Sequence, residues 1–215
     1  MNVNDFEKPD KLPSDFIKDI FARQHKLAKQ YLPIEEANGL LITSDIPVNI
    51  HDNKGQARLK DMAWRCTEEL TEAMEALDKK EYTHFYEELA DAMHFLVEFC
   101  ILADFEAGYG ASLKYRFYIA HGTMPPNTDC VSSDLIYLQS MTFLKHLGLS
   151  CNCLKNKPWK QSQHLTDRNK FHKNMSHAFQ EFIHLCKVAG FDETSLYCMY
   201  VRKYQVNEFR QESDY

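Results

Sequence analysis

The stretch WRCTEELTEAMEALDKKEYTHFYEELADAMHF, residues 64–95, decides how this chain of 215 residues folds. It contains two pairs of acidic residues, and the members of each pair are three positions apart: Glu69 with Glu72, and Glu88 with Asp91. That spacing places both carboxylates of a pair on one face of a helix. The polar segment 78–82 predicts a turn between two helices, the second capped by Thr83. At about 1.5 Å of rise per residue, the nearer member of each pair lies roughly 8 to 9 Å from the turn, so the two pairs are level.

Four ionised carboxylates at one height raise one another's pKa values and destabilise a hairpin unless a cation neutralises them. Mg²⁺ prefers oxygen ligands and keeps positions open for water and phosphate oxygens, so we expect a magnesium site, with Mn²⁺ as a substitute. A solvated acidic helix face, helped by Lys79 and Lys80, is the alternative interpretation. It is weakened because the second acidic pair lies beside an apolar stripe of helical period, formed by Phe85, Leu89, Ala92, Leu96, Phe99 and Ala103.

His94 stands one turn after Asp91 in this second helix. The apolar stripe predicts a largely buried helix, and a buried acid without a partner is costly. His94 is therefore a candidate to hold Asp91 in place or to contact a ligand. A core histidine bonded to a backbone carbonyl is an equally good interpretation of His94 alone.

The composition favours an all-α protein, because only seven Gly and seven Pro accompany many Glu, Lys, Leu and Ala. The net charge of −6 argues against nucleic acid as a partner. Seven cysteines, an odd number, fit a reduced cytoplasmic protein better than a disulfide scaffold. The N-terminus lacks the pattern of a signal peptide, and the longest apolar run, 95–103, is interrupted by Glu98. That run is too short to span a membrane, so we expect a soluble cytoplasmic protein.

The whole chain predicts one domain over residues 1–215, with an extended arm at 1–13 and no linker that would divide it. A first helix capped by Ser14 is expected to end before Pro33. The other helices are expected at about 56–78, 83–107, 133–149, 166–188 and 192–211, with irregular connections at 33–55 and 121–133.

Two further segments carry candidate binding residues. Lys203, Asn207 and Arg210 share a face of the expected final helix, and a row of donors suits a polyphosphate. Cations near the C-terminus of a helix also interact favourably with the helix dipole, so these residues could instead serve only to stabilise the helix. Lys160 beside Trp159 suits phosphate binding with base stacking, or equally a solvated turn with a buried tryptophan.

These parts together fit the metal-assisted hydrolysis of a phosphoanhydride. Two or more Mg²⁺ ions would polarise the phosphoryl oxygens while a carboxylate activates a water molecule. Lysine and arginine would stabilise the charge that develops on the leaving pyrophosphate. The sequence has no Gly-rich P-loop and no order of residues typical of a covalent nucleophile.

EELTE followed by EELADAMHF resembles the ExxE…ExxD signature of the all-α nucleoside triphosphate pyrophosphohydrolases, the superfamily of MazG and the dimeric dUTPases. The DxxHF ending resembles the dUTPase branch. LKNKPWKQSQHLTD (154–167) and YVRKYQVNEFRQESDY (200–215) are similar to phage dCTP pyrophosphatases of the T-even type. The resemblance implies a helical bundle with a four-helix metal-binding core. It also implies Mg²⁺-dependent hydrolysis of dCTP, and of dUTP, to the monophosphate and pyrophosphate. In an infected host's cytoplasm this reaction would control the deoxynucleotide pool during phage DNA synthesis.

The resemblance also implies roles for particular residues. The metal ligands would be Glu69, Glu72, Glu88 and Asp91, with Glu69 orienting the attacking water. The substrate contacts would be Lys203, Asn207, Arg210 and Lys160. Gln24 would contact the base, although an ordinary surface glutamine is the alternative. Ala28 departs from the family, which usually has an Asn four residues after this Gln. The family is dimeric, so a homodimer or higher oligomer that shares its sites is expected.

Other functions remain open. Asp91-x-x-His94 and Glu181-x-x-His184 each resemble half of a di-iron carboxylate site in a ferritin-like bundle, although the ExxE pair has no role there. A non-catalytic helical interaction protein is disfavoured by the acidic cluster. Within the favoured class, dUTP alone or a purine deoxynucleotide is the alternative substrate.

Overall fold

The computed structural model describes residues 12–105, 132–157, 159, 161 and 164–213. In these residues the chain forms six helices and no strand, as predicted for an all-α protein. The helices are α1 (Phe16–Ala37), α2 (Asn53–Asp78), α3 (Tyr82–Leu102), α5 (Ser133–Cys153), α6 (Arg168–Val188) and α7 (Glu193–Glu212).

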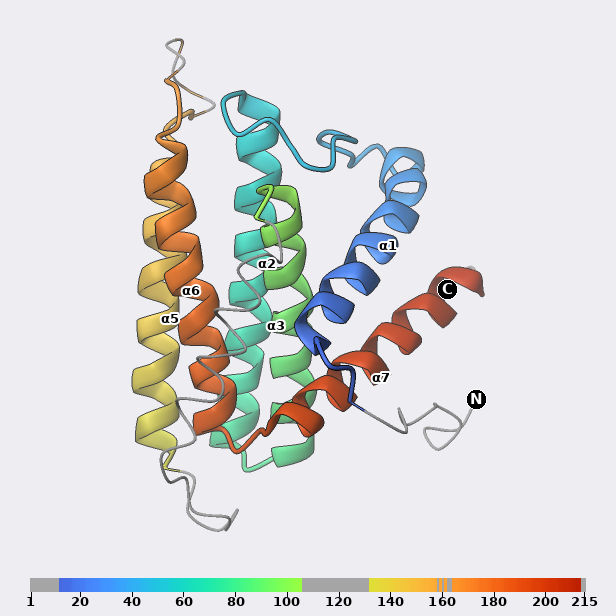
Figure 1. Cartoon of the computed structure of the whole chain (residues 1–215), viewed down its shortest axis with the longest axis vertical. Coiled ribbons are helices and arrows are strands. Elements are labelled where there is room, and N and C mark those ends of the chain that lie inside the picture. The colour runs from blue at the N-terminus through green and yellow to red at the C-terminus, as the bar shows by residue number, and fades with distance from the viewer. Residues whose placement is uncertain (1–11, 106–131, 158, 160, 162–163, 214–215) are drawn as a thin grey trace.

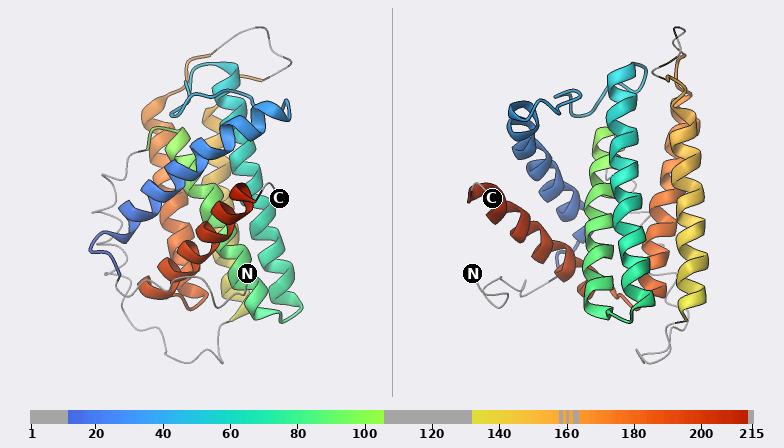
Figure 2. Two further views of the ribbon diagram at one scale, coloured as in Figure 1. Left: turned by 90° about the vertical axis from the view of Figure 1, so that its right-hand side faces the viewer. Right: turned by 180° about the vertical axis from the view of Figure 1, so that it is seen from behind.

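Helices α2, α3, α5 and α6 form an elongated bundle, and α1 and α7 lie outside it on the side of α3 (Figure 1). Helices α2 and α3 form one antiparallel hairpin, and α5 packs along α6 as a second pair. The views in Figure 2 show α1 and α7 crossing the same face of the bundle at a slant. Both outer helices contact α3 and each other, so four helices, α1, α2, α3 and α7, surround the space over the acidic hairpin.

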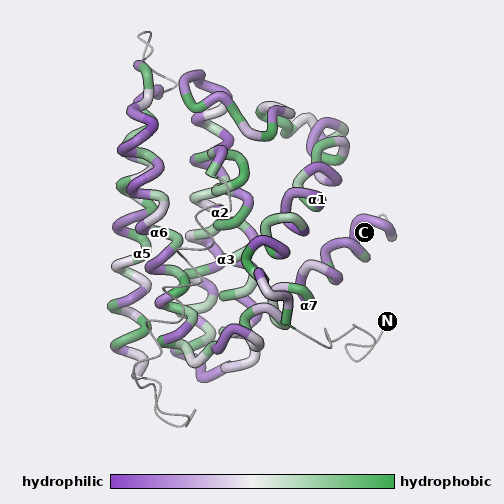
Figure 3. Tube along the Cα trace, viewed as in Figure 1, coloured by the Kyte–Doolittle hydropathy of each residue, from purple (hydrophilic) through white to green (hydrophobic). Residues whose placement is uncertain are grey.

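The core of the bundle is rich in phenylalanine. Phe99 of α3 packs edge-to-face against Phe171 of α6, and Phe143 of α5 packs in the same way against Phe182. These four rings are fully buried, and aromatic pairs of this kind add to the stability that burial alone provides. Along the bundle helices, hydrophobic and hydrophilic residues alternate in short segments, as expected for helices buried on one side (Figure 3).

The turn between α2 and α3 has the position that the sequence predicts. Lys80 adopts a positive φ of 61°, and the amide of Glu81 donates to the carbonyl of Ala76 at 2.9 Å, which closes the end of α2. The predicted cap is wrong, because Glu81 rather than Thr83 occupies the N-cap position and α3 begins at Tyr82. No side-chain hydrogen bond caps the start of α3.

Helix α1 does not end before Pro33, which lies inside it. The final turn continues to Ala37 because Glu35 is held by an ion pair with Arg58 of α2, with 3.1 Å between Oε2 and Nη1. Gly39, with a φ of 68°, then reverses the chain. At the other end, Asp15 rather than Ser14 caps the helix by accepting a hydrogen bond from the amide of Lys18.

Other expected helix boundaries also shift. Helix α3 ends at Leu102 rather than near 107, and Asp104 follows with a positive φ of 55°. Helix α5 continues to Cys153, past the expected end at 149. The arm at 1–13, apart from its last two residues, and most of the connection at 121–133 lie outside the described residues. No helix in the described part of the chain is both long and apolar enough to cross a membrane.

Candidate active site

A cavity of about 370 Å³ lies between α1, α2, α3 and α7. Its lining is a mixture of charged and apolar side chains from all four helices. The lining residues are Gln24, Leu27, Tyr31 and Glu35 of α1; Met62, Arg65 and Glu69 of α2; Asp91, His94, Phe95 and Glu98 of α3; and Lys203, Asn207 and Arg210 of α7. The cavity therefore brings one carboxylate from each acidic motif together with the donor row of the final helix.

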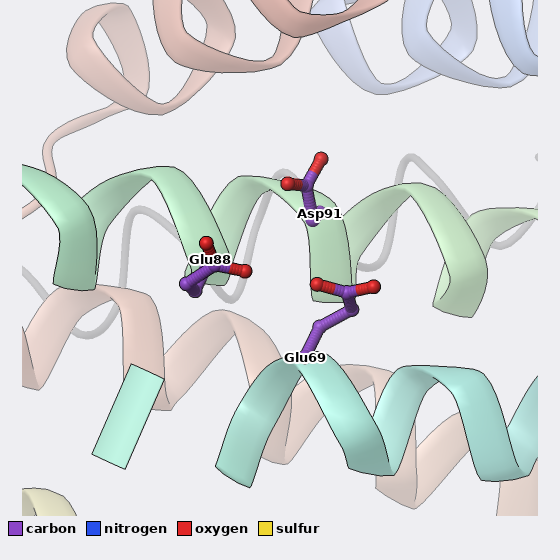
Figure 4. Close-up of side chains that lie close together, drawn as sticks. All are labelled: Glu69, Glu88 and Asp91. Carbon is purple, nitrogen blue, oxygen red and sulfur yellow. The ribbon is translucent and has the colours of Figure 1, made fainter. Parts of the chain in front are cut away.

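Three of the predicted metal ligands form a cluster at one end of this cavity. Glu69 of α2 and Glu88 and Asp91 of α3 each place a carboxylate oxygen within 4.8 Å of the others. Figure 4 shows Glu69 reaching from α2 towards α3, where Glu88 and Asp91 lie on neighbouring turns and the carboxylate of Asp91 is directed away from α2. The two motifs are thus level in the hairpin, as the helical rise predicts.

The proximity of these carboxylates makes them costly to ionise. The pKa of Glu69 is raised to about 8 by partial burial, by its hydrogen bond with Glu88 and by the negative charge of Asp91. Burial also raises the pKa of Asp91, although the ammonium of Lys203 opposes this effect. The cluster is therefore short of positive charge.

Glu72, the fourth predicted ligand, is exposed and lies outside the cluster. Its charge nevertheless contributes to the raised pKa of Glu69 one turn earlier on α2. Glu88 is buried, and its Oε1 lies 3.1 Å from Nδ1 of the half-exposed His84, one turn earlier on α3.

The donor row of α7 lines the wall of the cavity beside the cluster. Nζ of Lys203 lies 2.5 Å from Oδ2 of Asp91, and both side chains are largely buried. Asn207 and Arg210 follow along the same face of α7 and also line the cavity. The structure thus brings the three donors and the acidic cluster into a single space.

Gln24 and His94 lie in the cavity wall but bind each other. The hydroxyl of Tyr200 donates to Gln24 Oε1 at 2.7 Å, and Gln24 Nε2 donates to Glu98 Oε2 at 3.0 Å. His94 Nδ1 lies 2.8 Å from Gln24 Oε1, and its Nε2 lies 3.2 Å from the carbonyl of Tyr200. Burial lowers the pKa of His94 to about 3, so the ring is neutral, and it stacks on Tyr200 instead of holding Asp91.

Sequence reasoning missed two buried charges, Glu98 in the wall of the cavity and Arg58 beside it. Arg58 is 2% exposed; its Nη1 contacts Glu35 and the carbonyl of Thr43, while its Nε and Nη2 are buried without a hydrogen-bond partner. Glu98, 5% exposed, has a pKa raised by burial, and its Oε1 lies 3.9 Å from Arg58 Nη2. The sequence does contain a sign of Glu98, because this acidic residue interrupts an apolar run. It also lies seven positions after Asp91 and therefore on the same face of the helix.

The tryptophan segment lies apart from the cavity. Trp159 is 77% exposed and does not line the cavity, and Lys160 lies outside the described residues. The start of this segment is anchored at the N-terminal end of α2, where the amide of Asn156 donates to Gln56 Oε1 at 2.9 Å.

The two halves of a di-iron site do not meet. Glu181 and His184 lie on α6, and Glu181 Oε2 accepts a hydrogen bond from Gln139 of α5 at 2.7 Å. Among the described residues, the acidic cluster of α2 and α3 is the one group of three or more such side chains close enough to share a metal ion.

Comparison with models of protein families matches residues 75–215, about two thirds of the chain, to a family described as dUTPase. The matched part includes Glu88, Asp91 and the donor row, while Glu69 precedes it. Neither the curated proteins nor the solved structures contain a match. The chain belongs to this family, the all-α dimeric dUTPases, which confirms the predicted superfamily.

Proposed function

From this family membership, we propose that the chain hydrolyses dCTP, and dUTP as a second substrate, to the nucleoside monophosphate and pyrophosphate. The family supports hydrolysis of a nucleoside triphosphate. The observation that carries the proposal is the cavity itself, in which the acidic cluster and the donor row of α7 share one space. The preference for dCTP rests on the resemblance of segments 154–167 and 200–215 to the phage enzymes.

The residues of the cluster fit a hard divalent cation. Glu69, Glu88 and Asp91 offer oxygen ligands alone, and the raised pKa values of Glu69 and Asp91 support a cation as their partner. We propose that they hold Mg²⁺, with Mn²⁺ as a substitute and Glu72 as a further ligand. When bound, such ions neutralise phosphoryl oxygens and lower the pKa of a coordinated water.

The chain's own groups supply the remaining chemistry. Lys203, Asn207 and Arg210, which line the same cavity, would donate to phosphate oxygens and stabilise the charge of the departing pyrophosphate. The resemblance assigns Glu69 to orient the attacking water, and its carboxylate would accept the proton of that water. The apolar side chains of Leu27, Met62 and Phe95 provide walls for the base and exclude bulk water from it.

Release of pyrophosphate from a panel of ribonucleoside and deoxynucleoside triphosphates, in Mg²⁺ and in EDTA, tests this function. We expect turnover of dCTP and dUTP that EDTA abolishes. Turnover confined to purine nucleotides would agree with the metal-assisted mechanism and refute the assignment of a pyrimidine substrate. Absence of turnover with every nucleotide would refute the proposed function.

Two further parts of the proposal concern the setting. In an infected cell's cytoplasm, this reaction would remove dCTP from the deoxynucleotide pool and supply dCMP. We also propose a homodimer, because the resembled family is dimeric. Sedimentation velocity tests this, and a single species with the mass of one chain at micromolar concentration would contradict it.

A further inference from the structure

Glu98 is a buried carboxylate in the wall of the cavity. This residue lies seven positions after Asp91 on α3, which corresponds to two helical turns or about 10 Å along the helix axis. The acidic cluster and Lys203 therefore mark one end of the cavity, and Glu98 marks the other. A nucleotide whose phosphates lie at the first end extends its base towards the second.

The carboxylate of Glu98 is held in place by two neighbours. Its Oε2 accepts a hydrogen bond from Gln24 at 3.0 Å, and Gln24 is itself held by the hydroxyl of Tyr200. Its Oε1 lies 3.9 Å from Nη2 of Arg58, which is too far for a hydrogen bond. The positive charge of Arg58 thus stands behind a carboxylate that keeps acceptor capacity on Oε1.

Burying a carboxylate without full pairing is costly, which points to a ligand that donates a hydrogen bond to Glu98. Arg58 is 2% exposed and does not line the cavity, so its Nη2, which has no hydrogen-bond partner, supplies positive charge near Glu98 without contacting such a ligand. Unsatisfied buried polar groups typically cost a protein stability and are retained where they serve binding or catalysis. Glu98 lines the cavity, so a ligand there reaches its carboxylate directly.

The shape of a pyrimidine nucleotide determines which atom meets Glu98. The sugar is attached to N1, and C4 lies opposite N1 across the ring, so the substituent on C4 reaches deepest into the cavity. In cytosine this substituent is an amino group, which donates hydrogen bonds. In uracil it is a carbonyl oxygen, whose lone pairs repel a carboxylate oxygen.

We propose that Glu98 determines base specificity by accepting a hydrogen bond on Oε1 from the 4-amino group of cytosine. Gln24 and Arg58 are the positioning residues that hold the carboxylate for this contact. The inference rests on the proposed function and deepens it, because it assigns the discrimination between dCTP and dUTP to one side chain. The discrimination arises because a carboxylate accepts from an amino group but cannot pair with a carbonyl.

Ligand binding to the unaltered protein tests the inference without a mutation. Calorimetry in Mg²⁺ would compare dCMP, dUMP and the deoxynucleotide of 2-pyrimidinone, which lacks any substituent at C4. A lost hydrogen bond to a charged acceptor weakens binding roughly tenfold to a hundredfold, so we expect dCMP to bind at least tenfold more tightly than either analogue. Equal affinities for the three ligands would overturn the inference.

Two variants of Glu98 then identify the side chain. In Glu98→Gln, the single amide oxygen pairs with Gln24, because that contact is a hydrogen bond and the one to Arg58 is not. The amide NH₂ then faces the cavity, so the ratio of kcat/KM for dCTP over dUTP should fall by at least about tenfold. Glu98→Asp is the matched control, which keeps two acceptor oxygens and should keep the ratio while the rates decline.

The outcomes distinguish a failure of the proposed function from a failure of the specificity assigned to Glu98. If the unaltered protein hydrolyses no nucleotide, the proposed function fails, and the binding comparison still decides the role of Glu98. If it hydrolyses dCTP but Glu98→Gln leaves the dCTP to dUTP ratio unchanged, only the specificity inference fails. Loss of the ratio in Glu98→Asp to the same extent as in Glu98→Gln would also overturn it, since acceptor chemistry would then not matter.

Discussion

Replacing Glu69 by glutamine should stabilise the protein at high pH in the absence of divalent cations. The pKa of Glu69 rises from an ordinary value of 4.5 to about 8 in the folded protein, so the folded state favours the neutral form. Stability contributed by this neutral carboxyl is fully present below pH 4.5 and is lost as the pH rises through about 8. Glutamine imitates the neutral form at every pH and removes this loss.

The size of the effect follows from the same values. A pKa moved from 4.5 to about 8 corresponds to an upper limit of about 5 kcal/mol at high pH. Glu69 is only half buried, so solvent screens the repulsion, and we expect about 2 kcal/mol. At pH 5 the folded state keeps Glu69 largely protonated, and the two proteins should then be nearly equal in stability.

Urea unfolding followed by circular dichroism, in EDTA at pH 5 and at pH 9, measures this difference. Adding Mg²⁺ at pH 9 provides the control, since a cation that binds the folded cluster should stabilise the unaltered protein more than the variant. A variant less stable than the unaltered protein at pH 9, or a difference independent of pH, would refute the electrostatic account of the cluster.

Asp91→Asn should abolish turnover while leaving the helical circular dichroism intact, and retained turnover would remove the role of the cluster in catalysis. Replacing both Lys203 and Arg210 by alanine should weaken the binding of a nucleoside triphosphate at least tenfold in calorimetry, because hydrogen bonds to charged groups are worth about 1.5–3 kcal/mol each. An unchanged affinity would mean that these two cations only stabilise the fold. Gly55→Ala should lower the midpoint of thermal unfolding by several degrees at a cost of about 2 kcal/mol, because an added Cβ would lie 2.1 Å from the carbonyl oxygen of Asn49. An unchanged midpoint would show that the loop before α2 moves freely.

The acidic hairpin was predictable because its information is local. Helical rise and a spacing of three residues place Glu69 level with Asp91 once the turn at 78–82 is recognised, and the structure has that turn. The same reasoning placed Lys203, Asn207 and Arg210 on one face of α7, and all three line the cavity. Both predictions depend only on residue spacing within single helices and on one short turn.

The partners of these residues were not predictable, because they depend on how helices distant in sequence cross. Nothing in the sequence near Lys203 shows that its ammonium reaches Asp91, or that Gln24 is bound to Tyr200 and Glu98. The predicted end of α1, before Pro33, was wrong for a similar reason. Pro33 disfavours a helix locally, but the ion pair between Glu35 and Arg58 holds the following turn in place.

The position of α1 and α7 on one face of the hairpin has a consequence for how the protein is made. The two helices lie far apart in the chain and contact each other through Tyr197 and Asp19, and through Lys26 and Glu208. During synthesis, the acidic hairpin leaves the ribosome well before α7, and until then its carboxylates lack the counter-charge of Lys203. Contacts this distant in sequence form slowly. The nascent chain therefore carries an incomplete cavity, which cannot bind phosphates until α7 has docked.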